Sequence, residues 1–226
     1  DDGPSGDHAL WITPQIEYME IIPSIISTSY QGKGPEVSSG TEKKLLDKIK
    51  RLPQQGLPLE NTSFDWLLQP SRSKAGIYAT PDGKSILLSN GMVARMFRVL
   101  PNLSTLDIFN RMTGESMLRA VSSEGSLTID GKRWELGGLA GQPERGYFQM
   151  EWVEQMTTRS GSFLIEDFRI EELQEDIKWA RSRWALNKNV PTGKRLTFVL
   201  KGEKETEGVT VELHYDLYDH IPVIRK

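Results

Sequence analysis

The segment between residues 179 and 187 combines the residue types that bind sugars. Trp179 and Trp184 supply flat apolar faces, on which the axial C–H surface of a sugar ring stacks. Arg181, Arg183 and Asn187 supply hydrogen-bond donors for the hydroxyl groups. Core packing is the competing interpretation, because large domains also bury tryptophan with arginine stacked on the ring. Trp134, Tyr147 and Trp152 fall in the same half of the chain.

Glycoside hydrolysis needs two carboxylates at a defined separation on either side of the bond. The chain has 31 acidic residues, and no spacing among them singles out a pair. The densest group lies between residues 151 and 176, where we expect a solvated acidic surface. Its members are Glu151, Glu154, Asp167, Glu171, Glu172 and Asp176. The sequence therefore predicts no catalytic residue in this chain.

Metal and cofactor sites are not predicted either. The chain has no cysteine and only three histidines, His8, His214 and His220, which argues against a zinc site. Gly137 and Gly138 do not precede a helix of the kind that binds phosphate groups, so a nucleotide site is not expected.

Charge and hydropathy exclude two classes of partner. The formal net charge is -3, with 28 basic and 31 acidic residues, so no basic field would attract nucleic acid. The apolar stretch at residues 21–26 contains Pro23 and is too short to cross a membrane. The acidic N-terminus does not have the pattern of a signal peptide, which fits either a cytoplasmic protein or an exported one that has lost its leader.

Residues 1–75 form an irregular extension that contains one predicted helix. Proline, glycine and serine interrupt the apolar clusters of this region. The helix is expected at residues 41–52, with Thr41 as its N-cap and Pro53 as its end. Four apolar residues recur there with helical spacing, at Leu45, Leu46, Ile49 and Leu52.

From residue 76 to residue 226 the pattern changes to the alternation of strands. Asp82-Gly83, Asn90-Gly91 and Asp130-Gly131 stand between apolar runs, which is the strongest short-range signal for a hairpin. Eleven short strands with little helix predict an all-β fold, a large two-sheet antiparallel β-sandwich. The strands are expected at 76–80, 84–89, 92–99, 104–110, 116–121, 126–130, 133–136, 163–170, 195–200, 209–218 and 222–225, with helical turns at 150–157 and 171–179.

Four runs in this region carry a resemblance to a known family. They are ILLSNGMVARMFRV at 86–99, residues 102–119, residues 127–139, and VTVELHYDLYDHIPVIRK at 209–226. Residues 76–226 resemble the N-terminal β-supersandwich, or galactose mutarotase-like domain, of α-galactosidase-like glycoside hydrolases. In that family the catalytic carboxylates lie in a downstream barrel, onto which no residue of this chain maps.

The resemblance implies a non-catalytic sandwich that supports a downstream catalytic domain and binds carbohydrate. Two alternatives stay open. A self-standing carbohydrate-binding module would use the residues between 179 and 187, and a mutarotase-like epimerase would use His214 as its acid. A strand that ended at Lys226 would leave an open sheet edge, from which we expect a homo-oligomer.

Overall fold

The predicted all-β sandwich with a single α-helix is confirmed by the computed structural model of the protein. The structure describes residues 34–56, 65–68, 73–174 and 191–226. Residues 31–226 form one unit, so the α-helix belongs to the same unit as the strands. No helix in the described ranges is long and apolar enough to cross a membrane.

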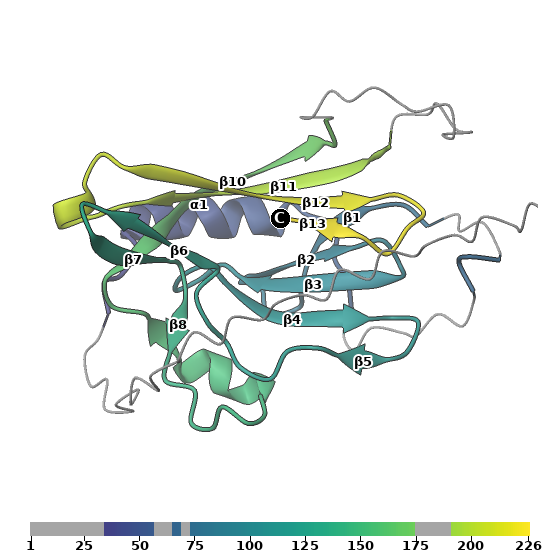
Figure 1. Cartoon of the computed structure of the whole chain (residues 1–226), viewed down its shortest axis with the longest axis horizontal. Helices are drawn as coiled ribbons and strands as arrows, with labels where there is room; N and C mark the ends of the chain where they lie inside the picture. Colours follow the sequence, from purple (N-terminus) through teal and green to yellow (C-terminus); the bar gives the residue numbers. More distant parts are fainter. Residues whose placement is uncertain (1–33, 57–64, 69–72, 175–190) are drawn as a thin grey trace, which may run out of the picture. The chain divides into compact units, whose positions relative to one another are not determined.

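The first sheet has five antiparallel strands that follow one another along the chain (Figure 1). The Asp82-Gly83 and Asn90-Gly91 turns join its first three strands, and both glycines adopt a positive φ, as the hairpin prediction requires. The strands are β1 (Gly76–Ala79), β2 (Ser85–Ser89), β3 (Val93–Arg98), β4 (Ser104–Asn110) and β5 (Glu115–Ser116).

The second sheet has six strands in the order β13-β12-β11-β10-β7-β6. Its neighbours are antiparallel except β10 and β7, which pair in parallel at Phe163 and Leu136. The Asp130-Gly131 turn joins β6 and β7 as predicted. The strands are β6 (Gly125–Ile129), β7 (Lys132–Leu136), β10 (Ser162–Glu172), β11 (Gly193–Lys201), β12 (Thr210–Tyr218) and β13 (Ile224–Arg225).

Four short elements lie outside these two sheets. The chain from residue 139 to residue 158 begins and ends in a two-stranded ribbon, β8 (Leu139–Ala140) and β9 (Thr157–Thr158), which encloses the 3-10 helix η1 (Met150–Gln155). Helix η1 confirms the helical turn predicted at 150–157. The turn predicted at 171–179 is wrong where it is described, because β10 continues through Glu172. Another 3-10 helix, η2 (Lys204–Thr206), joins β11 to β12.

The core between the two sheets is built from alternate side chains. Phe97 of the first sheet contacts Phe198 and Tyr215 of the second, with ring centroids 5.0 Å and 4.7 Å apart. Both faces of the first sheet are covered. Ile86 and Leu88 belong to the inter-sheet core, whereas Leu87 belongs to a second apolar cluster. That cluster joins β2, β3 and β4 to the segment around η1, through Val121, Leu139, Val153 and Met156.

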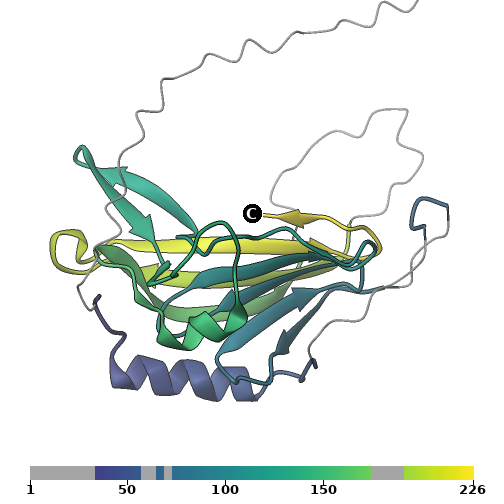
Figure 2. The ribbon, with the colours of Figure 1, turned by 90° about the horizontal axis from the view of Figure 1, so that it is seen from below.

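Helix α1 (Ser39–Lys50) closes the core beside the strands (Figure 2). Leu45 and Ile49 are fully buried in the inter-sheet core, as the helical spacing predicts. The predicted N-cap is wrong, because the Ser38 hydroxyl accepts the hydrogen bond from the Thr41 backbone N–H at 3.3 Å. The helix therefore begins two residues before the predicted start at residue 41.

Candidate functional site

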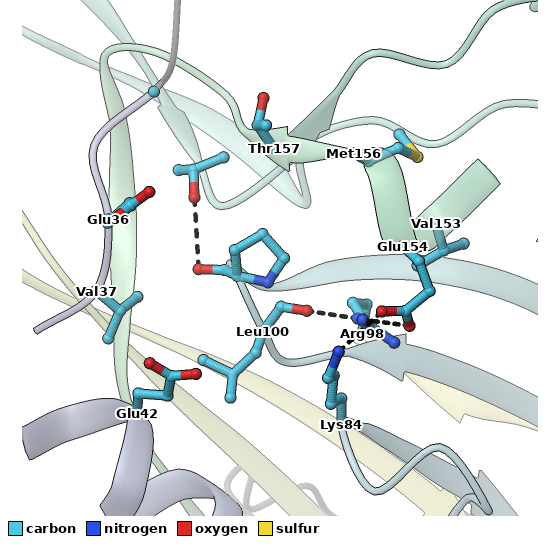
Figure 3. Close-up of a pocket in the computed structure, with 13 residues that line it drawn as sticks. Glu36, Val37, Glu42, Lys84, Arg98, Leu100, Val153, Glu154, Met156 and Thr157 are labelled. Atoms are coloured by element: carbon cyan, nitrogen blue, oxygen red, sulfur yellow. Dashed lines mark hydrogen bonds and ion pairs between the residues drawn. The ribbon is translucent and has the colours of Figure 1, made fainter. Parts of the chain in front are cut away.

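A polar cleft of about 380 Å³ lies beside α1 and η1. Its walls come from three stretches of chain: the start of α1 with the residues before it, the strand ends of the first sheet, and the segment from η1 to β9 (Figure 3). Lys84, Arg98 and Glu154 converge on one side of the cleft, and Glu36 and Glu42 come from the other side. Leu100 lies between the two sides, and Pro101 also lines the cleft.

The turn between β1 and β2 fixes one wall of this cleft. Asp82 accepts hydrogen bonds from the Thr80 hydroxyl at 2.6 Å and from the Ser85 hydroxyl at 2.7 Å. It also accepts the backbone N–H groups of Lys84 and Ser85, at 2.9 Å and 3.0 Å. Burial acts to raise the pKa of Asp82, but these hydrogen bonds and the Arg98 charge outweigh it and hold the pKa below its usual value.

Arg98 joins that turn to η1 across the cleft wall. Its side chain is only 3% exposed. Its guanidinium donates to Asp82 Oδ2 at 2.9 Å and to Glu154 Oε1 at 2.8 Å, and its Nε donates to the Leu100 carbonyl oxygen. Because Ala94, Met96 and Arg98 alternate with core residues along β3, Arg98 lies on the η1 side of the first sheet.

Glu154 is the charged acceptor that this wall presents to the cleft. Lys84 Nζ lies 2.8 Å from Glu154 Oε2, so two cations share one carboxylate. The hydrogen bonds from Lys84 and then from Arg98 hold the pKa of Glu154 below its usual value. Glu154 therefore stays ionised at neutral pH and accepts hydrogen bonds, whereas a general acid would have to carry a proton.

The cleft offers donors and acceptors side by side, with no net excess of positive charge in its lining. Lys84 can donate, and Glu42 and Glu154 can accept. A neutral molecule with several hydroxyl groups matches this mixture, because each hydroxyl both donates and accepts. A volume of about 380 Å³ is at the small end of the range of ligand pockets.

Replacing Arg98 by methionine should separate the turn at Asp82 from η1. We expect a loss of about 1–3 kcal/mol in the free energy of unfolding, because the Leu100 carbonyl and two carboxylates lose a buried donor. Urea unfolding at neutral pH measures this change. The matched control is Lys84→Met, which removes an exposed partner of the same carboxylate and should cost about 0.5 kcal/mol or less. Equal costs for the two variants would contradict the central position of Arg98.

A second ionic cluster lies inside the sandwich, around Glu124. The Glu124 side chain is 2% exposed, and it accepts hydrogen bonds from Arg95 at 2.9 Å and from the Thr105 hydroxyl at 2.7 Å. The Tyr215 hydroxyl also donates to it, and Lys226 Nζ lies 3.5 Å away. Burial acts to raise the pKa of Glu124, but Arg95 and the other donors outweigh it, so the carboxylate is ionised. Its partners occupy its oxygens, which fits a structural role.

Asp216 is a second buried carboxylate with the same kind of environment. Arg195 donates to it at 2.7 Å and 2.9 Å, and Arg225 donates from β13 at 2.9 Å. Burial acts to raise the pKa of Asp216, and the two guanidinium groups lower it below its usual value. This contact fastens the short strand β13 to β12 and β11.

His214, the acid of the epimerase hypothesis, lies on the outer face of β12 and is 43% exposed in its side chain. Its Nδ1 is 2.8 Å from the Thr197 hydroxyl, and its Nε2 is 3.7 Å from Glu212. Arg169 binds Glu212 at 2.8 Å and lowers the pKa of that carboxyl. The arginine therefore weakens the nearest carboxylate as a base.

The predicted sugar-binding residues Trp179, Arg181, Arg183, Trp184 and Asn187 lie outside the described residues. The structure neither brings them to the cleft nor separates them from it.

Of the three other aromatic residues, Trp134 packs at the inter-sheet core with Lys132 Nζ 4.3 Å from its ring centroid. Tyr147 and Trp152 lie together elsewhere, with ring centroids 5.3 Å apart.

In the acidic group, Glu151, Glu171 and Glu172 are exposed as predicted. Cations engage Glu154, and they also engage Asp167, through Lys44 and Lys48. Asp176 lies outside the described residues.

Sequence reasoning missed Arg98 and Lys84 as cleft residues. A signal for Arg98 was present, since an arginine on a strand with a buried face needs a partner charge.

Within the described ranges, no group of three or more histidine, cysteine or acidic side chains could hold a metal ion. Comparisons with protein-family models, with curated proteins and with solved structures each find no match.

Proposed function

We propose that this chain is a non-catalytic, carbohydrate-binding sandwich domain that supports a catalytic domain elsewhere in a carbohydrate-active protein. The polar cleft carries the proposal, because Lys84 and Glu154, which Arg98 holds in place, set a donor and an ionised acceptor side by side for a neutral polyol. The two-sheet sandwich supports it too, in keeping with the resemblance of residues 76–226 to the sandwich of α-galactosidase-like glycoside hydrolases.

The engaged carboxylates argue against a catalytic role. Glu124, Glu154 and Asp216 each accept from at least one arginine, and in each the pKa is lowered. A glycosidase acid needs a raised pKa in order to deliver its proton near neutral pH. None of these three carboxylates is therefore suited to act as the acid of a glycosidase.

Calorimetric titration of the chain with galactose, glucose and mannose tests the binding role. We expect saturable binding of at least one of them with a Kd of about 1 mM, equivalent to about 4 kcal/mol. Glu154→Gln should raise that Kd about tenfold, because a charged acceptor is lost. Glu171→Gln is the control, since Glu171 is exposed near the end of β10 and does not line the cleft. Absence of binding for all three sugars would contradict the proposal.

The non-catalytic part needs its own assay, with nitrophenyl α- and β-glycosides of the same sugars. We expect release of nitrophenol at the rate of buffer alone. Turnover that disappears in Glu154→Gln would instead make this carboxylate a catalytic group and overturn the proposal.

A further inference from the structure

Two aromatic side chains stand together at the surface beyond the cleft. Tyr147 is 52% exposed, and its ring lies 5.3 Å from that of the half-buried Trp152, at an interplanar angle of 48°. Met150, between them in sequence, is 42% exposed. Large apolar side chains that gather on a surface usually mark a binding site.

The loop that carries Tyr147 is held in place by Gln142. The Gln142 amide nitrogen lies 3.2 Å from the Arg119 carbonyl oxygen, 2.5 Å from that of Glu144 and 3.1 Å from that of Tyr147. Its side-chain oxygen accepts the backbone N–H of Val121 at 2.8 Å. Val121 is buried in the second apolar cluster, so the loop is anchored to the sandwich.

Neighbouring side chains pack into the second apolar cluster, whereas Tyr147 stays exposed and Trp152 half-buried. Phe148 and Val153 belong to the second apolar cluster, whereas Tyr147, next to Phe148, points to solvent. Tyr147 is therefore not needed to fill the second apolar cluster, and that packing gives no reason for its exposed position. Helix η1 also links the pair to the cleft, because Val153 and Glu154, which line the cleft, directly follow Trp152.

We propose that Tyr147 and Trp152 form a stacking platform for a sugar ring of a neutral oligosaccharide or polysaccharide. The apolar face of a pyranose ring fits an aromatic face, and exposed polar side chains near the pair in sequence, Glu144, Arg145, Gln149 and Glu151, can bond its hydroxyls. The anchored loop lowers the entropy cost of binding, because the platform is already ordered. The inference rests on the proposed function and gives it a second site, for glycans longer than one sugar.

Affinity electrophoresis tests this platform in gels that contain soluble galactomannan, xyloglucan, mixed-linkage β-glucan or dextran. We expect at least one polysaccharide to retard the unaltered chain. Tyr147→Ala and Trp152→Ala should each weaken that retardation about fivefold or more, and Tyr147→Phe, which keeps the ring, should preserve it. Val223→Ala is the control, because Val223 is an exposed apolar residue on the hairpin of β12 and β13.

The outcomes separate this inference from the proposed function. If a polysaccharide retards the unaltered chain and both alanine variants equally, the platform is wrong while carbohydrate binding stands. If no polysaccharide retards the chain but calorimetry detects a monosaccharide, the platform is again wrong and the cleft stands. If neither assay detects a saccharide, both fail. A change of oligomeric state in Tyr147→Ala, measured by sedimentation with retardation unchanged, would assign the pair to a protein contact and also overturn the inference.

Discussion

Arg95→Met is expected to destabilise the chain by about 3–5 kcal/mol at neutral pH. Arg95 comes from β3, reaches Glu124 at 2.9 Å inside the sandwich, and lies with its guanidinium carbon 4.6 Å from the Tyr215 ring centroid. Without Arg95, a carboxylate with 2% exposure keeps only the Thr105 and Tyr215 hydrogen bonds and the more distant Lys226 amine. A loss of this size is a large fraction of the stability of an ordinary domain.

The loss should depend on pH in a way that identifies Glu124. In the unaltered chain the pKa of Glu124 lies below its ordinary value of 4.5, so its contribution is complete above that value and disappears as the pH falls through the lowered pKa. In Arg95→Met the effect of burial is opposed by fewer charges, which raises the pKa of Glu124. The variant then loses stability as the pH rises through 4.5. The difference between the two chains should therefore grow as the pH rises from below 4.5 toward neutral.

Urea unfolding at several pH values measures this difference. The double variant Arg95→Met/Glu124→Gln should recover part of the loss, since no charge is then left buried. The control is Arg169→Met, which breaks an ion pair on the outer face whose partners are 45% and 41% exposed and should cost less than about 1 kcal/mol. A cost for Arg95→Met that is independent of pH would show that packing alone is lost.

Hairpin turns are the part of this fold that the sequence predicts best. Each Asp-Gly or Asn-Gly pair needs a positive φ at its glycine, and the structure has it at Gly83, Gly91 and Gly131. The strand predicted at 116–121 is wrong in length, because β5 ends at Ser116. The reason is a side chain from a distant loop, since the Val121 N–H bonds to Gln142 and not to a strand.

For each buried ionic contact, the sequence predicts the position of the arginine but not the identity of its acidic partner. Alternation along β3 places Arg95 on the face of Phe97, and a buried arginine requires an anion. The period of two does not say which of the acidic residues supplies it, because Glu124 is 29 positions away and precedes β6 of the other sheet. The same limit applies to Arg98 and Glu154, which are 56 positions apart. Local pattern gives the face of a strand, and the partner depends on how the sheets stack.

For the aromatic residues, too, the sequence gives the residue type but not whether the side chain lies in the core or at the surface. Composition alone selects Trp134, Tyr147 and Trp152 equally. Their environments differ, since Trp134 packs at the core under Lys132 and Tyr147 is exposed on an anchored loop. Neighbouring residues of one loop can differ in this respect. Phe148 packs against the second apolar cluster, whereas Tyr147 does not and is exposed.

Phe97→Ala should be the most costly change in the apolar core, at about 3–5 kcal/mol. Its ring is fully buried and lies against two aromatic rings of the opposite sheet, 5.0 Å from Phe198 and 4.7 Å from Tyr215. Removing it leaves a cavity whose walls belong to two sheets, which the backbone can close only in part. Urea unfolding measures the loss. Phe109→Ala is the control, because Phe109 is only half-buried and should cost about 1 kcal/mol.

Phe97 also positions the two donors Tyr215 and Arg95 that bond Glu124. This contact can be tested more sharply than by the loss in the free energy of unfolding of Phe97→Ala alone. The Tyr215 ring rests on Phe97 and donates its hydroxyl to Glu124, and the Arg95 guanidinium carbon lies 5.1 Å from the Phe97 ring centroid. A double-mutant cycle of Phe97→Ala with Arg95→Met should therefore be non-additive by about 0.5–3 kcal/mol. Additive losses in the free energy of unfolding would contradict this coupling through Tyr215. The aromatic contact and the buried ion pair would then stabilise the sandwich independently.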